Sequence, residues 1–214
     1  SVVGLADAVQ IAAGANHTCA ILDGGAVWCW GANDSRQLGN GTALNSAPGS
    51  VQGLRSVIGL ALGEAHSCAL LDGGTVQCWG RNSDGQLGDG TSAETRSTPT
   101  AVGELHDVEG LAAGAAHTCA WLRDGTAYCW GRARDGQLGS AGALECSPVR
   151  VAGLPDAGRV ESLAAGGTTD TSGDFLRLGG RTCAVTADGQ VYCWGAGLEN
   201  APPRSVPERV TGLS

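Results

Sequence analysis

Nine cysteines and four histidines are the residues of this 214-residue chain best suited to chemistry. Eight of the cysteines form four pairs whose partners lie ten positions apart. These pairs are Cys19 and Cys29, Cys68 and Cys78, Cys119 and Cys129, and Cys183 and Cys193. This spacing differs from that of a zinc knuckle, whose paired ligands are separated by about two to four residues. It predicts structural disulfides, which persist in an oxidising compartment. We therefore expect an extracellular, cell-surface or periplasmic protein.

The ninth cysteine and the histidines carry weaker signals. Cys146 has no partner at the repeated spacing, and it is either a buried apolar residue or an exposed thiol free to form an intermolecular bond. His17, His66 and His117 recur at one position of a repeat, where the fourth copy has Arg181. Because no catalytic or metal-binding partner accompanies them, we expect them to hydrogen-bond neighbouring strands. We expect no metal, no cofactor and no enzymatic activity, since nucleophile, zinc-hydrolase and phosphate-loop motifs are absent.

A β-hairpin is predicted between the two cysteines of each pair. The four pairs are centred on Gly24, Gly73, Asp124 and Asp188, and the residue after each centre is Gly25, Gly74, Gly125 and Gly189. A three-residue loop that ends in Gly suits a type I turn followed by a left-handed residue. With this loop the two cysteines lie opposite one another, at a distance that a disulfide tolerates.

The hairpins belong to a tandem repeat. The first cysteines of successive pairs lie 49, 51 and 64 residues apart, and a 12-residue insertion between Gly166 and Arg181 accounts for the longest spacing. A period of about 50 residues is typical of propeller blades. We predict a single domain over 1–214, with repeats at about 1–49, 50–99, 100–148 and 149–205 and an extra strand at 206–214.

Each repeat is predicted to form four short strands, because Val- and Ile-rich runs alternate with Gly and Asp-Gly turns. The first strand is assigned to a Val-x-Gly-Leu motif at Val2–Leu5, Val51–Leu54 and Val151–Leu154, and to the related Val-Gly-Glu-Leu at Val102–Leu105. A fifth copy, Val210–Leu213, would compete with the first for one position in a closed ring. We therefore expect an all-β fold of propeller-type blades in an open arc or part of a larger propeller, with a closed four-bladed ring as the alternative.

The repeats resemble the regulator-of-chromosome-condensation repeat family. The resemblance rests on HTCAILDGGAVWCWGANDSRQLGNGT, HSCALLDGGTVQCWGRNSDGQLGDGT and HTCAWLRDGTAYCWGRARDGQLG, and it covers essentially the whole chain. It implies four-stranded blades around a pseudo-symmetry axis, usually seven to a ring. The fourth repeat departs from the pattern, since Gly195–Glu199 replaces the Gly-Gln-Leu-Gly stretch. The paired cysteines are similar to those of bacterial secreted members, so the exchange-factor activity of the family's nuclear member is not carried over.

Charge and hydropathy exclude several partners. The net charge is −8, lysine is absent, and no basic cluster is available for nucleic acid or an anionic membrane. No apolar run approaches the roughly 18 residues that predict a membrane span, so no membrane insertion is expected.

Recognition is expected in the loops, because the repeats agree in their strands and differ after the Cys-Trp-Gly motif. The insertion at 167–180 is unique and polar, and its candidate binding residues are Thr168, Asp170, Asp174, Phe175 and Arg177. The first hypothesis is a non-catalytic scaffold that binds another protein through these loops. The alternative is a structural module whose open strand edges pair with further copies or with the rest of a longer chain.

Overall fold

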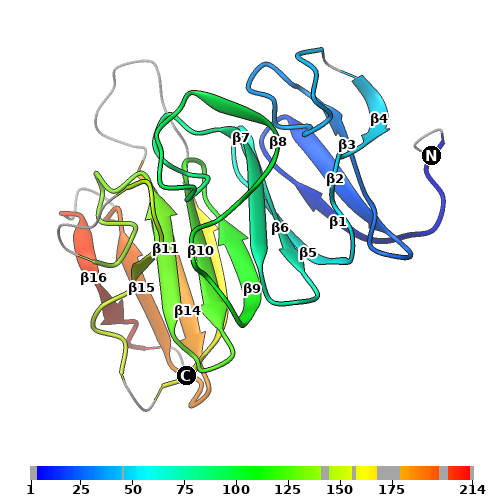
Figure 1. The fold of residues 1–214 in the computed structure, drawn as a ribbon. Coiled ribbons are helices and arrows are strands. Elements are labelled where there is room, and N and C mark those ends of the chain that lie inside the picture. The colour runs from blue at the N-terminus through cyan, green and yellow to red at the C-terminus, as the bar shows by residue number, and fades with distance from the viewer. Residues whose placement is uncertain are drawn as a thin grey trace.

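The computed structural model of the protein describes residues 4–44, 46–140, 145–155, 158–167, 179–197 and 202–212. Within these ranges the chain contains no helix and forms four antiparallel sheets of four strands, which we call blades 1 to 4. Figure 1 shows the four sheets side by side in an open arc, with the N-terminal blade at one end and the C-terminal blade at the other. The predicted all-β, propeller-type fold is confirmed.

The strands of each blade follow one another in chain order, so every blade is a meander. Blade 1 contains β1 (Ala8–Ala13), β2 (His17–Leu22), β3 (Val27–Gly31) and β4 (Ser46–Ser50). Blade 2 contains β5 (Val57–Leu62), β6 (His66–Leu71), β7 (Val76–Arg81) and β8 (Thr95–Ala101). Blade 3 contains β9 (Val108–Ala113), β10 (His117–Leu122), β11 (Ala127–Gly131) and β12 (Val149–Arg150). Blade 4 contains β13 (Val160–Gly166), β14 (Arg181–Thr186), β15 (Val191–Gly195) and β16 (Arg204–Arg209).

The first strand of each blade lies nearest the axis of the arc, because β1 contacts β5, β5 contacts β9 and β9 contacts β13. The fourth strands, β4, β8, β12 and β16, form the outer edges. Three of these outer strands contain a proline, namely Pro48, Pro99 and Pro207. Proline is tolerated at a sheet edge, because the edge leaves alternate N–H groups without a ladder partner.

The assignment of strands to the Val-x-Gly-Leu motif is wrong. Val51–Leu54, Val102–Leu105 and Val151–Leu154 are connections that directly follow the outer strands β4, β8 and β12. Their Val and Leu side chains fold back into the core between blades, as Val51 and Leu54 do, and this burial produced the apolar signal. The segment expected as an extra strand at 206–214 instead contributes its first residues to β16, the outer strand of blade 4.

The hairpin prediction holds in its main features. Cys19 pairs with Cys29 in the strand register, the other three pairs are equivalent, and all four are disulfides. The Gly that closes each loop is left-handed, with φ between 70° and 85°. Blade 1 departs from the expected turn, because Gly24 also has a positive φ of 86°, as in a type II turn. Cys146 is a free, half-buried thiol.

The hydrophobic core is divided among the three boundaries between blades. Each boundary buries a disulfide of one blade against a Trp of the next, together with a Leu from the Gln-Leu-Gly turn and the Val of the connection. The buried tryptophans are Trp79, Trp130 and Trp194, which hold one repeat position and pack between the blades. Trp121 lies against Gly110, where an added Cβ would come within 2.1 Å of the indole ring. Cys183 and Cys193 are half-buried on the far side of blade 4.

Candidate functional site

The loops of the four blades lie at two opposite ends of the strands. The turns between first and second strands and the longer loops between third and fourth strands share one end, because the strands alternate in direction. We call this end the loop face; its described segments include 14–16, 63–65, 114–116, 32–44, 82–94 and 132–140. The short hairpins between second and third strands lie at the other end. The loop face therefore carries almost all of the sequence that differs between repeats.

A polar contact that we call the interblade lock fixes the loop-face side of every boundary. His17 Nε2 lies 2.8 Å from Ser67 Oγ of the next blade. His66 Nε2 lies 2.9 Å from Thr118 Oγ1, and His117 Nε2 lies 2.9 Å from Thr182 Oγ1. The histidines were expected to connect neighbouring strands, and the structure shows that they connect neighbouring blades.

The lock also contains the main-chain carbonyl of the Gln-Leu-Gly turn. The carbonyl oxygen of Gln37 accepts one hydrogen bond from Ser67 Oγ at 3.0 Å and another from Trp79 Nε1 at 2.8 Å. The same two bonds occur at Gln86, from Thr118 and Trp130, and at Gln137, from Thr182 and Trp194. Since the hydroxyl gives its only hydrogen to this carbonyl, it must accept a hydrogen from the imidazole. Each lock histidine is therefore the neutral tautomer with hydrogen on Nε2.

Burial controls the ionisation of these histidines. Desolvation lowers the pKa of His17 and His117 from 6.5 to about 4. Desolvation, with a smaller contribution from the charges of His17 and His117, lowers the pKa of His66 to about 3. The Nδ1 atoms of His17 and His66 are buried without a hydrogen-bond partner, so protonation there would create a buried charge with no acceptor.

The tryptophans of blades 1 and 2 provide a test of the lock. Replacing Trp79 with Phe is expected to lower the free energy of unfolding by about 1–3 kcal/mol, because a buried hydrogen bond and part of the indole volume are lost. Trp30 holds the same position in blade 1 but is only half-buried, and Trp30→Phe should cost less than about 0.5 kcal/mol. Urea unfolding of both variants measures the difference. Equal losses of unfolding free energy in the two variants would show that the hydrogen bond from Trp79 to the Gln37 carbonyl does not stabilise the fold.

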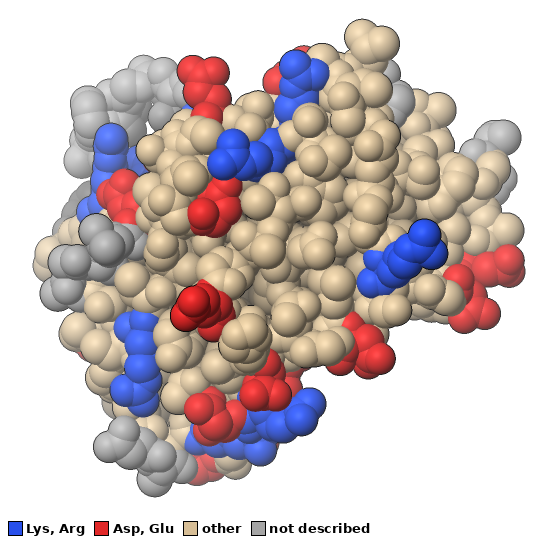
Figure 2. Space-filling model, viewed as in Figure 1, with Lys and Arg blue, Asp and Glu red and all other residues tan. Residues whose placement is uncertain are grey.

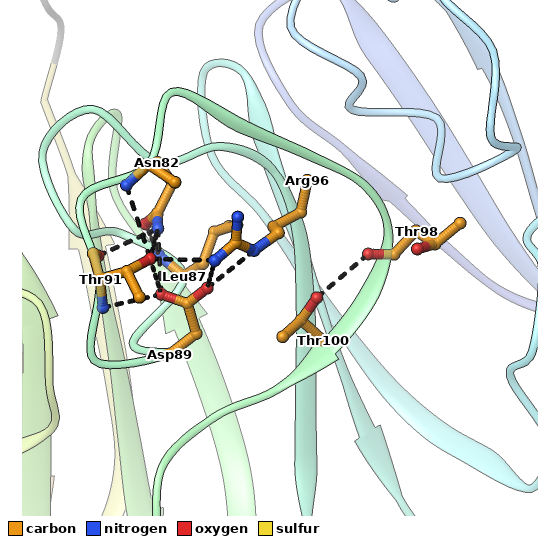
Figure 3. A network of polar contacts seen from close by, with 8 residues as sticks. Asn82, Leu87, Asp89, Thr91, Arg96, Thr98 and Thr100 are labelled. Carbon is orange, nitrogen blue, oxygen red and sulfur yellow. Dashed lines mark hydrogen bonds and ion pairs between the residues drawn. The ribbon is translucent and has the colours of Figure 1, made fainter.

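The loop between β7 and β8 is held by a network of polar side chains (Figure 3). Asn82 Nδ2 donates to Asp89 Oδ1 at 3.1 Å and to the carbonyl of Thr91 at 3.0 Å, while Asn82 Oδ1 accepts from Leu87 N. Asp89 also forms an ion pair with Arg96 at 2.8 Å. Asn82 is fully buried, so this loop presents a fixed shape to solvent.

The carboxyl of Asp89 titrates below its usual range. Partial burial raises its pKa. The opposing effects are larger in sum: the pKa is lowered by the side-chain and main-chain hydrogen bonds from Thr91, by the charge of Arg96 and by the hydrogen bond from the amide of Asn82. Asp89 is therefore ionised at neutral pH, and its ion pair with Arg96 persists in mildly acidic solution.

The equivalent loops of blades 1 and 3 differ from this loop in the side chains at the Asn82 and Asp89 positions. In blade 1, Asn33 donates to the carbonyls of Thr42 and Leu44, and neutral Asn40 stands where blade 2 has Asp89. In blade 3, Ala133 and Ser140 occupy the Asn and Asp positions, so neither the buried amide nor the carboxylate is present. At these two positions the loop of blade 1 has two amides, that of blade 2 an amide and a carboxylate, and that of blade 3 a methyl group and a hydroxyl.

The candidate binding residues Thr168, Asp170, Asp174, Phe175 and Arg177 lie outside the described residues. The two ends of their insertion are described and lie together at the loop face: an added Cβ on Gly167 would be 2.8 Å from the carbonyl oxygen of Gly179. An added Cβ on Gly180 would lie 2.9 Å from Gln137 Nε2. The insertion therefore leaves the scaffold beside the interblade lock of blades 3 and 4.

A cavity of about 400 Å³ opens on the axis of the arc at the loop face. Residues at the ends of the first strands of all four blades line it, and they pack so closely that a Cβ on Gly14 would come within 2.3 Å of the Gly63 carbonyl oxygen. Most of the residues that line it are Ala or Gly. Among the residues that the structure describes, no group of three or more His, Cys, Asp or Glu is placed to hold a metal ion.

The repeat pattern and the fold agree with one family of sequence models. The regulator of chromosome condensation (RCC1) repeat matches residues 8–37, 57–86, 108–137 and 179–200, and a second model of this repeat matches 24–70, 73–121 and 124–169. The chain belongs to the RCC1 repeat family. The resemblance noted from the Cys-Trp-Gly and Gly-Gln-Leu-Gly strings is thereby confirmed.

Two relatives in sequence are much longer proteins than this RCC1-repeat chain. The Ultraviolet-B receptor UVR8 of Arabidopsis thaliana is 34% identical over 215 residues, which cover 94% of this chain and 46% of the receptor. The human E3 ubiquitin-protein ligase HERC2 is 32% identical over 108 residues, or 49% of this chain and 2% of the ligase. The chain thus spans less than half the length of either relative.

Solved structures show the same arrangement of blades. Prp20p of Saccharomyces cerevisiae, described with its binding to Gsp1p and histones, superposes with a TM-score of 0.81 and 25% identity over 99% of this chain and 52% of its own. Human WBSCR16 has a TM-score of 0.78 at 23% identity, covering 96% of this chain and 53% of its own, which supports the fold alone. The open arc therefore corresponds in length to about half of these chains.

Two functional groups of the lock were missed by sequence reasoning. The hydroxyl residues Ser67, Thr118 and Thr182 and the Gln of the Gln-Leu-Gly turn recur at fixed repeat positions, so repetition alone could have identified them. Recurrence does not reveal that the main-chain oxygen of the glutamine is the acceptor. The glutamine side chain has another role, since Oε1 of Gln37 accepts from Ser35 N and holds the loop.

Proposed function

We propose that this protein is a non-catalytic scaffold that acts outside the cytoplasm and binds another protein through its loop face. The main support is the contrast between identical locks and different loops: the three boundaries share one set of polar contacts, whereas the loops at 32–44, 82–94 and 132–140 differ in charge. A rigid scaffold with variable loops is a common arrangement for recognition. The four disulfides support an oxidising compartment.

The surface is consistent with a protein partner. Figure 2 shows acidic and basic side chains scattered over one face of the arc, with wide uncharged areas between them. The net charge of −8 and the absence of lysine disfavour nucleic acid. Among the described residues no helix is long and apolar enough to cross a membrane. Prp20p, a structural neighbour, is described as binding Gsp1p and histones, and yeast RCC1 as binding Kap60.

Recognition through loops is favoured over assembly through open strand edges. The outer strands β8 and β16 carry Pro99 and Pro207, and their side chains are largely polar. Proline and charge at an edge oppose the addition of a further strand. A self-assembling module would need an edge free of such residues.

Shortening the loop face tests the proposal. The immobilised wild-type chain is exposed separately to the secreted and the cytosolic proteins of its source cells, beside a variant in which residues 168–178 are deleted. A control variant, Arg123→Ala, changes the hairpin end instead. We expect a protein from the secreted fraction to be captured saturably by the wild type and the control, and its affinity for the deletion variant to fall at least about tenfold, or about 1.4 kcal/mol. Equal affinity of all three variants would contradict the loop assignment, and capture from the cytosolic fraction alone would contradict the compartment.

A further inference from the structure

One of the four equivalent disulfides is open to solvent. Cys183 and Cys193 of blade 4 are half-buried, whereas the paired cysteines of blades 1 to 3 are at most 1% exposed. All four pairs lie directly opposite one another in the strand register and are ten positions apart. The blade 4 disulfide therefore differs from the others in what covers it.

In blades 1 to 3 the next blade covers the disulfide. The indoles of Trp79, Trp130 and Trp194 belong to the same buried clusters as the disulfides of blades 1, 2 and 3. On β15, Cys193 and Trp194 are neighbours and point to opposite sides of the sheet. Since Trp194 packs against blade 3, the disulfide of blade 4 faces away from blade 3, at one end of the arc (Figure 1).

This side of blade 4 lacks the groups that hold the next blade at the three boundaries. Arg181 replaces the lock histidine, and its guanidinium donates to the carbonyl of Ala196 in its own blade at 2.7 and 3.1 Å. The sequence after Gly195 contains no Gln-Leu-Gly turn. Val185 is 38% exposed, whereas Ile21 at the same repeat position is 2% exposed. The chemistry of this side is therefore different from that of a blade boundary.

A cavity of about 450 Å³ opens beside the blade 4 disulfide, and Cys193 forms part of its wall. The charged residues that line the cavity are Arg181, Arg204, Arg209 and Glu208. Glu208 forms an ion pair with Arg204. Three positive charges and one negative charge give the cavity a net charge of +2, although the whole chain has a net charge of −8.

From these observations we propose that the disulfide of Cys183 and Cys193 is a site of exchange with small anionic thiols, the chemical class of glutathione. The thiolate of the reagent attacks Sγ of Cys193 and forms a new disulfide with it. The bond between the two cysteines breaks, and its electron pair goes to Sγ of Cys183, which leaves as a thiolate and takes a proton from water. One disulfide replaces another, so the exchange requires no separate oxidant.

The positive charges of the cavity favour this class of reagent in two ways. They attract the carboxylates of the thiol and so raise its local concentration. Arg181 and Cys183 are two residues apart on β14, on the same side of the sheet, and a nearby positive charge stabilises a thiolate. The pairing of β14 with β13 and β15 keeps Cys183 opposite Cys193, so the exchange is reversible.

The three covered disulfides provide an internal control for the exchange. The folded chain, in a Cys146→Ser background, is incubated with reduced glutathione at neutral pH, quenched with iodoacetamide and mapped by peptide mass spectrometry. We expect glutathione on Cys193 and the alkyl group on Cys183, formed at least about tenfold faster than the products of any other pair. In concentrated urea, where no blade covers a disulfide, the four pairs should react at similar rates. Equal rates in the folded chain, or a faster reaction at a covered pair, would overturn the proposal.

A second measurement tests the preference for an anionic thiol. The exchange rate at Cys183 and Cys193 with glutathione is divided by the rate with uncharged 2-mercaptoethanol at equal thiolate concentration. In Arg181→Gln/Arg209→Gln the cavity has no net charge, and this ratio should fall at least about threefold. The control Arg55→Gln/Arg123→Gln has the same total charge, does not alter the cavity lining, and should keep the ratio of the parent chain.

The single variant Arg209→Gln leaves the hydrogen bonds of Arg181 and the ion pair of Arg204 in place, so it should fold as the parent does and lower the ratio in the same direction. An unchanged ratio in both cavity variants would overturn the assignment to anionic thiols. An equal fall in the control would show that the total charge of the chain, rather than the cavity, selects the reagent, and would overturn it as well.

Discussion

Replacing Cys68 and Cys78 with alanine is expected to lower the free energy of unfolding by about 3 kcal/mol through the entropy of the unfolded chain alone. The cross-link joins residues ten positions apart, so it restricts a small loop in the unfolded state. Both cysteines are fully buried between blades 2 and 3, and the lost sulfur volume adds about 1–2 kcal/mol of packing free energy. Urea unfolding without reductant, in a Cys146→Ser background, measures the total.

Blade 4 offers the matched control for this variant. Cys183 and Cys193 close a loop of the same length, but both are half-buried on the uncovered side of the blade. Their replacement should lose the entropic contribution and little packing, so it should cost about 1–2 kcal/mol less than replacement of the blade 2 pair. An equal cost in the two blades would show that the sulfur atoms of blade 2 do not contribute through packing.

Reduction of all four disulfides should unfold the chain. The four loops do not overlap, so their entropic contributions add to about 11 kcal/mol, which is comparable to the entire stability of a typical domain. Loss of the far-ultraviolet β signal on addition of a phosphine reductant at neutral pH checks this. A reduced chain that keeps its sheets would show that the three interblade cores suffice for folding.

The hairpins could be predicted from sequence because their determinants are local. Gly25 and its equivalents close the loop, and the loop length alone places Cys19 opposite Cys29. The 50-residue period was visible for a related reason, since the Cys-Trp-Gly motif and the paired cysteines recur at fixed positions. Such features need no knowledge of how one blade meets the next.

The outer strands and the locks could not be predicted in the same way. The outer strand β8 has neither an apolar alternation nor a buried face, so Val102–Leu105, which is buried for another reason, appeared to be the better strand. The main-chain carbonyl of Gln37 acts through its position between two blades, and a residue's identity does not report the direction of its backbone. The open arc was predicted correctly, but from a mistaken count of five Val-x-Gly-Leu strands. The structure supports the arc for another reason, since blades 1 and 4 each have one side that no other blade covers.

Acid is expected to destabilise the fold through the three lock histidines. An unfolded histidine has a pKa near 6.5, whereas burial lowers the pKa of His17 and His117 to about 4 and that of His66 to about 3. Between about pH 6.5 and pH 4 the unfolded chain therefore binds more protons than the folded chain. The free energy of unfolding is at its full value above pH 6.5 and falls as the pH is lowered through this window.

The expected loss is large because the three groups act in the same direction. At pH 5, each lock histidine lowers the free energy of unfolding by about 2 kcal/mol relative to pH 8, so the three together lower it by about 6 kcal/mol. Urea unfolding at pH 8, 6.5 and 5 measures this loss. An unfolding free energy that is unchanged at pH 5 would mean that the histidines take up protons in the folded chain as readily as in the unfolded chain, and the lowered pKa values would be wrong.

Two substitutions separate the lock from other acid effects. His66→Gln should weaken the fold at pH 8, because the hydrogen bond to Thr118 is disturbed, and it should reduce the difference between pH 8 and pH 5 by about 2 kcal/mol. His106 is exposed on the connection after β8, so His106→Gln should change neither quantity. The carboxyl of Asp89 does not contribute between pH 8 and pH 5, because its pKa is lowered from an ordinary value of 3.8 and its stabilising effect is lost only in more acidic solution. A pH dependence that survives His66→Gln in full would contradict the role of His66. The lock of His66 would then hold blades 2 and 3 together at neutral pH without taking part in their separation by acid.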